Sequence, residues 1–400
     1  MPFTREQVHN FAAGPSPLPT PVLEEAAKGL INYDGTGMGV CELSHPNLRT
    51  LLGVPDNYSI LFAQGGGTTQ FASVFLNLLA YRRLQHAGDV DYKPPKVDYV
   101  VTGSWSSKAY AEAQRLATHP SPNAPPFADV RLAATTKPQK FTTLPKAEDY
   151  DFSPDAAYVY YCENETINGI EFPPAGSDSP YAFPFDKVPK DVPIVADYSS
   201  SFISRAIPQI ERHGIIYAGA QKNLGPSGVT IVIVRNDLLV DTTEAMKLGG
   251  IPVVPIQSEY KILADNKSLY NTPPVFPIYV SALVLKYLIA ERGGIEGLAK
   301  TNGEKAALLY KTLDEAEAKG AVKCVVREKD ARSWMNVTFE IIGDGKEKEF
   351  LDGAEKQGFR QIKGHRSVGG IRLSLYNAVS LESVKAACEY ISRFAASCSS

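Results

Sequence analysis

The sequence predicts an α/β protein built on a large, mainly parallel β-sheet that is covered by helices. Six short runs rich in apolar and β-branched residues lack polar alternation, which is typical of strands buried on both faces. Helical patterns separate the early runs, and this order favours parallel strands joined by helical crossovers. The expected strands are residues 59–63, 97–101, 157–161, 192–196, 214–218 and 229–234. The expected early helices are residues 20–30, 69–85 and 106–117.

The start of the first helix and the pattern after Pro277 predict further elements and the division into domains. Thr20 is the expected N-cap of the first helix and Pro21 its first position. After Pro277 a helix reaches a Gly-Gly pair at 293–294, and a long polar helix over 295–319 follows. The pattern then predicts a strand, a helix, a strand and a helix at 333–342, 346–358, 370–375 and 381–394. We therefore expect a large α/β domain over 17–292 and a small α+β domain formed by 1–16 and 293–400.

Composition narrows the class of protein. The 400 residues are 44% hydrophobic and 21% charged, with a formal net charge of −3. That charge excludes a broad basic surface, so nucleic acid is not expected as a partner. The most apolar run, residues 278–290, is too short for a membrane span, and the N-terminus lacks the layout of a secretion signal. Five scattered cysteines without a C-x-x-C pair favour a reducing compartment and no metal site, so we expect a cytoplasmic enzyme.

The strongest local chemical signal is Lys222, which follows a buried strand in small, glycine-rich surroundings. A desolvated lysine loses part of its preference for the ammonium form and becomes a nucleophile suited to a carbonyl cofactor. Asp197 ends the preceding strand, where ligands of open α/β sheets bind, and could pair with a protonated pyridine nitrogen. Taken singly, Lys222 could be a solvent-facing strand end and Asp197 a turn cap. The pair is a stronger signal than either residue.

Three other strand ends carry residues that could bind a cofactor. Gly67 and Thr68 belong to a glycine run between a strand and a helix, where backbone N–H groups can bind an anion. The run lacks the Gly-Lys-Ser/Thr ending of a nucleotide loop, which argues against ATP. Trp105 could stack on an aromatic cofactor, and Thr166 could donate to a ring hydroxyl. Taken alone, the glycine run and Thr166 could each belong to an ordinary turn, and Trp105 could pack in the hydrophobic core.

The last signal is a pair of arginines and a histidine near the C-terminus. His365 and Arg366 lie close in sequence to Arg372. Arginine forks bind carboxylate and phosphate bidentately, so two of them suit a substrate with an anion at each end. The alternative is a pair of solvated surface arginines.

Together these motifs resemble the phosphoserine aminotransferases, class-V members of the fold-type I pyridoxal-phosphate enzymes, and most closely the eukaryotic, fungal-like form. The likeness runs nearly end to end, and the Asn-Thr-Pro-Pro and Gly-His-Arg pieces separate this family from other class-V members. The matching motifs include Phe-Ala-Ala-Gly-Pro at 11–15, Ser-His at 44–45, Asn-Glu-Thr at 164–166, Asn-Thr-Pro-Pro at 271–274 and Gly-His-Arg at 364–366.

The resemblance implies a role for each residue. Lys222 would bind pyridoxal 5′-phosphate covalently and move the proton between the substrate Cα and the cofactor C4′, while Asp197 would keep the pyridine nitrogen protonated. Trp105 would stack on the ring and Thr166 would contact its hydroxyl. The cofactor phosphate would be bound by Gly67, Thr68 and Gln221, and by Asn271 and Thr272 of the partner subunit, which implies a homodimer with shared active sites.

The resemblance also implies the substrates. Arg372 would hold the α-carboxylate, while His45, His365 and Arg366 would receive the distal anion. Glutamate would give its amino group to the cofactor, and 3-phosphohydroxypyruvate would then take it to yield O-phosphoserine and 2-oxoglutarate in serine biosynthesis.

One stretch departs from the family pattern. In the family, Ser-His is followed by an arginine and then a helix, whereas here Pro46 follows His45 and a stretch the size of a short helix is missing. A skipped exon or faulty gene model would explain such a clean gap, and a real loss would impair the substrate pocket. Arg49 could fill the vacancy. The gap makes an inactive pseudoenzyme one alternative. A second alternative is another class-V enzyme, such as an alanine–glyoxylate aminotransferase or a cysteine desulfurase, although none of the five cysteines lies in a convincing loop for the desulfurase.

Overall fold

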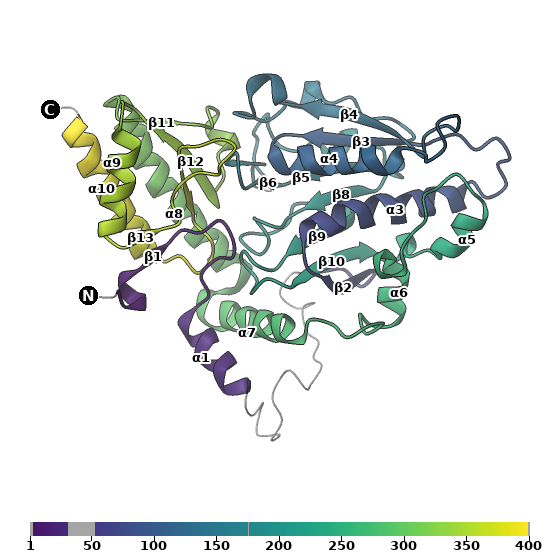
Figure 1. Ribbon diagram of the computed structural model, residues 1–400, viewed down its shortest axis with the longest axis horizontal. Helices are drawn as coiled ribbons and strands as arrows, with labels where there is room; N and C mark the ends of the chain where they lie inside the picture. The colour runs from purple at the N-terminus through teal and green to yellow at the C-terminus, as the bar shows by residue number, and fades with distance from the viewer. Residues whose placement is uncertain (1–2, 31–52, 175, 399–400) are drawn as a thin grey trace.

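A computed structural model describes residues 3–30, 53–174 and 176–398. Its main feature is a seven-stranded sheet in which six strands run the same way and β10 runs antiparallel to both neighbours (Figure 1). The order is β2 (Tyr58–Gln64), β10 (Val229–Arg235), β9 (His213–Gly219), β8 (Ile194–Asp197), β5 (Val159–Cys162), β3 (Lys96–Val101) and β4 (Asp129–Thr135). All six predicted strands are therefore present, and the expected α/β class is confirmed.

Within this sheet, the one strand that sequence patterning missed is β4, at the edge. Asp129 and Arg131 interrupt its apolar character, and its first four residues are exposed or half-buried. An edge strand contacts only one neighbour, so it does not need the continuous apolar run of a central strand.

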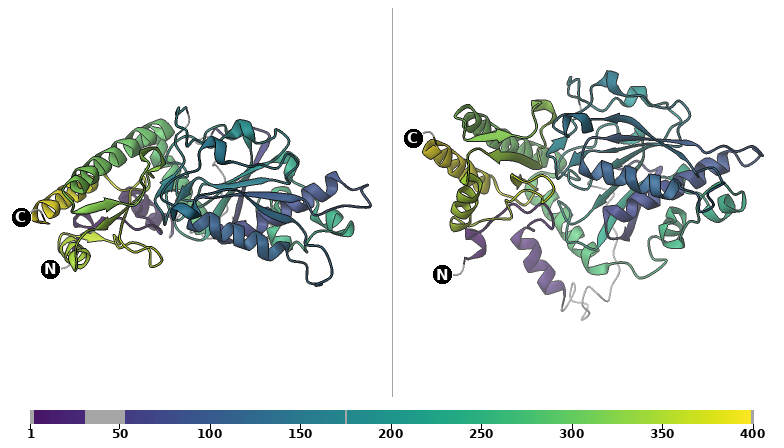
Figure 2. Two further views of the ribbon diagram at one scale, coloured as in Figure 1. Left: turned by 90° about the horizontal axis from the view of Figure 1, so that it is seen from above. Right: turned by 45° about the horizontal axis from the view of Figure 1, so that its top comes forward.

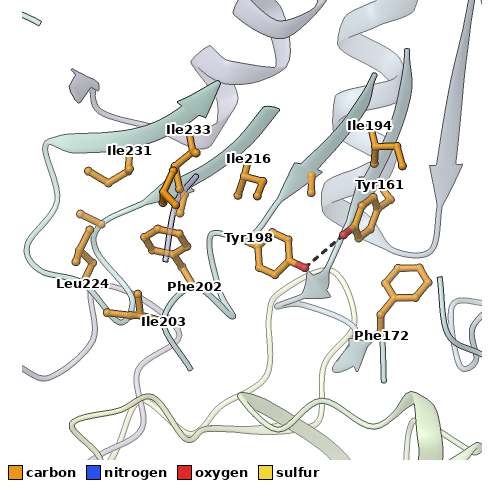
Figure 3. Packing of buried hydrophobic residues seen from close by; sticks show 14 of the residues in the cluster. Tyr161, Phe172, Ile194, Tyr198, Phe202, Ile203, Ile216, Leu224, Ile231 and Ile233 are labelled. Carbon is orange, nitrogen blue, oxygen red and sulfur yellow. Dashed lines mark hydrogen bonds between the residues drawn. The ribbon is translucent and has the colours of Figure 1, made fainter. Parts of the chain in front are cut away.

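Helices cover both faces of the sheet. The helices α3 (Gly67–Gln85) and α4 (Ser104–Ala117) pack on one face, together with α5 (Thr242–Lys247) and α6 (Tyr260–Asp265). The opposite face packs against α1 (Thr20–Gly29) and α7 (Val275–Arg292). Alternate residues of one strand enter different cores: Tyr160 of β5 packs with α3 and α4, whereas Tyr161 enters the other core, shown in Figure 3. A strand buried on both faces needs apolar residues at every position.

Helix α1 begins differently from the expectation. Its N-cap is Pro19, and Thr20 is the first helical residue, with no side-chain cap. The Pro19 carbonyl accepts from the N–H groups of both Val22 and Leu23, so the first turn closes one residue earlier than predicted. The predicted cap at Thr20 is therefore wrong.

A second, three-stranded antiparallel sheet lies beside the main one (Figure 2). It consists of β11 (Val322–Cys324), β12 (Asn336–Ile341) and β14 (Ile371–Ser374), and it packs against α8 (Gly294–Ala318), α9 (Lys346–Lys356) and α10 (Leu381–Cys398). Gly293 ends α7 and begins α8 with a φ of 69°, a left-handed conformation that glycine adopts without strain.

Short pairings complete the fold. The N-terminal β1 (His9–Asn10) pairs in parallel with β13 (Phe359–Arg360), so the start of the chain joins the C-terminal part, as Figure 1 also shows. The hairpin of β6 (Asn164–Glu165) and β7 (Ile170–Glu171) follows β5. These two-residue strands are too short for sequence periodicity to reveal. No described helix combines the length and apolar character needed to cross a bilayer.

Candidate active site

The carboxyl ends of five parallel strands open into one cavity of about 370 Å³. The loops after β2, β3, β5, β8 and β9 each contribute to its wall, and the small sheet contributes the remaining side. The predicted site residues that line it are Gly67, Thr68, Trp105, Thr166, Asp197, Gln221, Lys222, His365 and Arg372. The topology therefore gathers residues that are more than 300 positions apart in the chain.

Lys222 lies in the turn after β9 with its amine buried. Its Nζ donates to Thr166 Oγ1 at 3.0 Å and lies 5.8 Å from the ring centroid of Trp105. Burial lowers the pKa of Lys222, and the nearby Asp197 carboxylate opposes part of that change. The amine therefore has more of its neutral, nucleophilic form than a solvated lysine at the same pH.

Asp197 ends β8 with only 6% of its surface exposed. Its Oδ1 accepts from the backbone N–H of Ser199 at 2.8 Å. Desolvation raises the pKa of Asp197, while hydrogen bonds from Ser199 and the charge of Lys222 lower it. A buried carboxylate in a cavity wall is well suited to pair with a protonated ring nitrogen.

Trp105 occupies the first turn of α4 and is held there by a buried carboxylate. Glu165 accepts from the Trp105 and Ser106 backbone N–H groups, both at 2.8 Å. The indole Nε1 of Trp105 is buried and has no hydrogen-bond partner among the described residues. Glu165 was not predicted as a site residue, because the residues it contacts lie about sixty positions earlier.

The N-terminus of α3 forms another wall. Gly66 is its N-cap, no side chain caps it, and its first turn contains no acidic residue. The Gly67 and Thr68 N–H groups therefore lie at the positive end of the helix dipole without a side-chain acceptor at the cap. This arrangement is a ready site for a phosphate group.

Arg372 and His365 lie on the side of the small sheet. Arg372 Nη1 donates to the Thr166 carbonyl at 3.4 Å, whereas its Nε is buried with no partner among the described residues. His365 Nδ1 accepts from the Ser367 backbone N–H at 3.2 Å, so a neutral ring carries its proton on Nε2. Burial and the charges of Arg372, Lys108 and Arg366 lower the pKa of His365.

The other predicted site residues that the structure describes lie outside this cavity. Arg366 is exposed and outside the described lining of the cavity. Asn271 and Thr272 are exposed, and Asn271 lines a different cavity of about 160 Å³. Their predicted contact with a partner subunit stays a prediction. His45, Pro46 and Arg49 lie outside the described residues.

Comparison with known proteins identifies the relatives of this chain. The profile of the aminotransferase class-V family matches residues 8–387. The phosphoserine aminotransferase of Drosophila melanogaster is 43% identical, and the match covers 94% of each chain. Two solved structures are similar. The phosphoserine aminotransferase of Bacillus circulans subsp. alkalophilus has a TM-score of 0.82 at 38% identity, covering 98% of this chain and 99% of that one. The pyridoxal-phosphate-bound enzyme of Trichomonas vaginalis has a TM-score of 0.78 at 34% identity, covering 96% and 99%.

The family match spans nearly the whole chain, and the cavity at the strand ends contains the lysine, acid and tryptophan expected from it. The chain belongs to the class-V aminotransferase family.

Proposed function

We propose that this chain is a pyridoxal-phosphate-dependent phosphoserine aminotransferase. It transfers the amino group of glutamate to 3-phosphohydroxypyruvate and yields O-phosphoserine and 2-oxoglutarate. The observation that carries the proposal is the buried Lys222 amine, which donates to Thr166 and senses the charge of Asp197, in a cavity that also contains Arg372. The relatives that match nearly the full length of the chain support the substrate pair.

The residues present fit pyridoxal phosphate. The cavity offers a buried amine, a buried carboxylate and an indole N–H that has no hydrogen-bond partner among the described residues. An uncapped helix N-terminus lies in the same wall. When bound, the cofactor supplies a carbonyl carbon for the amine and a ring that withdraws electrons from the substrate Cα.

Three residues would act on the reacting atoms. Lys222 would hold the cofactor covalently through its amine, and the same amine would move the proton between the substrate Cα and the cofactor C4′. Asp197 would keep the pyridine nitrogen of the cofactor protonated, because its buried carboxylate is best compensated by a positive partner. Thr166, whose hydroxyl already accepts from Lys222, orients the amine and contacts the ring hydroxyl.

The phosphate group of the cofactor would be bound by main-chain and side-chain donors. Gly67 and Thr68 donate from the first turn of α3, and Gln221 adds its side chain. Asn271 and Thr272, which are exposed in the single chain, would complete the site of a second copy. We therefore propose a homodimer with shared active sites.

Arg372 would bind the α-carboxylate of either substrate. His365 and Arg366, together with His45, would bind the distal anion, which is a carboxylate in glutamate and a phosphate in 3-phosphohydroxypyruvate. One pocket can then serve both halves of the reaction. We place the enzyme in the cytoplasm, because Cys162, Cys324 and Cys388 are buried free thiols, in keeping with a reducing compartment.

The decisive experiment is an absorbance spectrum of the purified protein before and after glutamate. We expect the band of lysine-bound cofactor, its loss on adding glutamate, and its return on adding 3-phosphohydroxypyruvate. Lys222→Ala should lack the band while its circular dichroism is unchanged. Preference for pyruvate or glyoxylate as acceptor would instead favour another class-V aminotransferase, and a colourless protein that takes up no cofactor would favour a pseudoenzyme.

The gap after His45 gives a separate test. Loss of a charged hydrogen-bonding partner typically costs about 1.5–3 kcal/mol, or roughly one to two decades in binding. Inserting the family segment, with its arginine, should therefore lower the KM for 3-phosphohydroxypyruvate at least tenfold. Equal kinetic constants with and without the insert would contradict the idea that the pocket is impaired.

A further inference from the structure

A second cavity of about 400 Å³ adjoins the active-site cavity. Ile167, His365 and Arg372 line both of them. From these shared residues the second cavity, here called the outer cavity, extends to Lys140 and Lys323. Apart from His365 and Arg372, no residue of the outer cavity has a role in the proposed amino transfer.

The floor of the outer cavity is one face of the small sheet. Thr338 of β12 is paired with Arg372 of β14, and Glu340 of β12 is paired with Lys323 of β11. Paired residues, and residues two apart on a strand, project from the same face, so these four form one polar surface. The intervening Phe339 belongs to the hydrophobic core beneath α8, α9 and α10. The helices therefore cover the opposite face.

The rim of the outer cavity contains a strained turn. Lys140 and Phe141 are consecutive non-glycine residues in the left-handed region, with φ values of 54° and 56°. Phe141 packs against the cores on both sides of the main sheet, while the exposed Lys140 lines the outer cavity. The Arg327 N–H donates to the Thr142 carbonyl at 3.1 Å and ties this turn to the small-sheet side. Such strain persists only where the surroundings impose it, and it is concentrated at functional sites.

The charge of the lining is positive. Lys140 and Lys323 form no ion pair among the described residues, whereas Arg327 is neutralised by Glu317 at 3.0 Å. Glu340 is the single carboxylate among the described lining residues. At the inner end, the buried Arg372 Nε also lacks a partner in the described part of the chain. Unpaired cations in a concave site attract an anion.

We propose that the outer cavity is a second anion-binding site that holds a small phosphate dianion, free or as a monoester, with Lys140 and Lys323. Two ammonium groups match the charge of a phosphate dianion, and lysine binds phosphate as a point charge without a fixed geometry. His365 and Arg372 face both cavities, so an anion in the outer cavity weakens the binding of an anionic substrate.

The test measures binding of radiolabelled orthophosphate to the cofactor-loaded enzyme by equilibrium dialysis in a phosphate-free buffer. The variant is Lys140→Gln with Lys323→Gln, and its control is Lys319→Gln with Lys348→Gln, two exposed lysines outside the lining that give the same net charge. We expect about tenfold weaker binding in the variant and wild-type binding in the control. Glu340→Gln should tighten binding about threefold, because it removes a repulsive carboxylate.

Two further arms complete the experiment. Displacement of the label by glycerol phosphate would show that a monoester also binds, and its absence would restrict the site to free phosphate. Saturating 2-oxoglutarate, which occupies the active site, should weaken orthophosphate binding without displacing all of the label, because coupling between two anion sites is reciprocal. Complete displacement by 2-oxoglutarate, or equal affinities of the variant and its control, would overturn the proposal. Amino transfer in phosphate-free buffer tests the proposed function separately.

Discussion

His213 offers a test of how the fold fixes the active site. This fully buried histidine begins β9, the strand that leads to Lys222. Its Nδ1 donates to the Gln209 carbonyl at 3.2 Å, and its Nε2 accepts from Tyr161 on β5 at 2.9 Å. Tyr161 in turn lies 3.3 Å from the hydroxyl of Tyr198, the residue after Asp197 (Figure 3). The His213 ring thus connects β5, β8 and β9, the strands that lead to Thr166, Asp197 and Lys222.

Burial lowers the pKa of His213 from 6.5 to about 4, because the charged ring would lose its solvation by water. The unfolded chain then binds more protons than the folded chain between these two values. The stability contributed by the neutral ring is complete above pH 6.5 and is lost as the pH falls toward 4. Linkage gives a loss of about 2 kcal/mol between pH 7.5 and pH 5 from this residue alone.

The assay is urea unfolding of wild type and His213→Phe at both pH values. Phenylalanine keeps an aromatic ring but does not titrate, so the wild type should lose about 2 kcal/mol more unfolding free energy on acidification than the variant does. Other histidines titrate equally in both proteins and cancel. Equal losses, within about 0.5 kcal/mol, would refute the assignment of the neutral ring.

Three other substitutions test single contacts. A Cβ on Gly103 would overlap the Glu165 side chain. Gly103→Ala should therefore lower the free energy of urea unfolding by about 1–3 kcal/mol and weaken cofactor binding. Wild-type values for both quantities would contradict the close packing. The Asn223 side chain bridges main-chain groups of the segments after β8 and β14. Asn223→Ala should therefore lower the free energy of unfolding by about 2 kcal/mol and slow amino transfer. Unchanged turnover would show that this bridge does not position Lys222. Thr166→Val removes the acceptor for Lys222 Nζ. Because this acceptor favours the protonated amine, its loss should shift the pH midpoint of cofactor attachment downward by up to about one unit. An upward shift would contradict this role of Thr166.

Sequence patterning predicted the central strands because burial on both faces demands apolar residues throughout. The six-residue core of β10, from Val229 to Val234, is fully buried and reads as a strand without ambiguity. Its antiparallel direction was not predicted, because direction depends on the turn at 220–228 rather than on composition. The two-residue strands such as β6 and β1 carry no periodicity and depend on their partners.

The candidate site was likewise predictable only in part from the sequence. Lys222, Asp197 and Trp105 stand at the ends of predicted strands, and parallel strands end at the same edge of a sheet. Glu165 and Ser199 could not be found this way, since their roles consist of hydrogen bonds to groups distant in sequence. Ser199 Oγ accepts from the Gly219 N–H at 3.1 Å, which joins the loop after β8 to the end of β9.

The electrostatic balance at Lys222 links cofactor and substrate binding. Burial and the charge of Arg372 lower the pKa of the free amine, while Asp197 raises it. A substrate carboxylate paired with Arg372 cancels one of the two influences that keep the amine neutral. If Lys222 and Arg372 act as proposed, the amine would become a stronger base when the substrate is bound, at the stage where it would accept a proton from Cα. Because Asp197 raises the pKa of Lys222 as well, the acid and the substrate carboxylate would together favour the protonated lysine that the proposed reaction needs to return this proton.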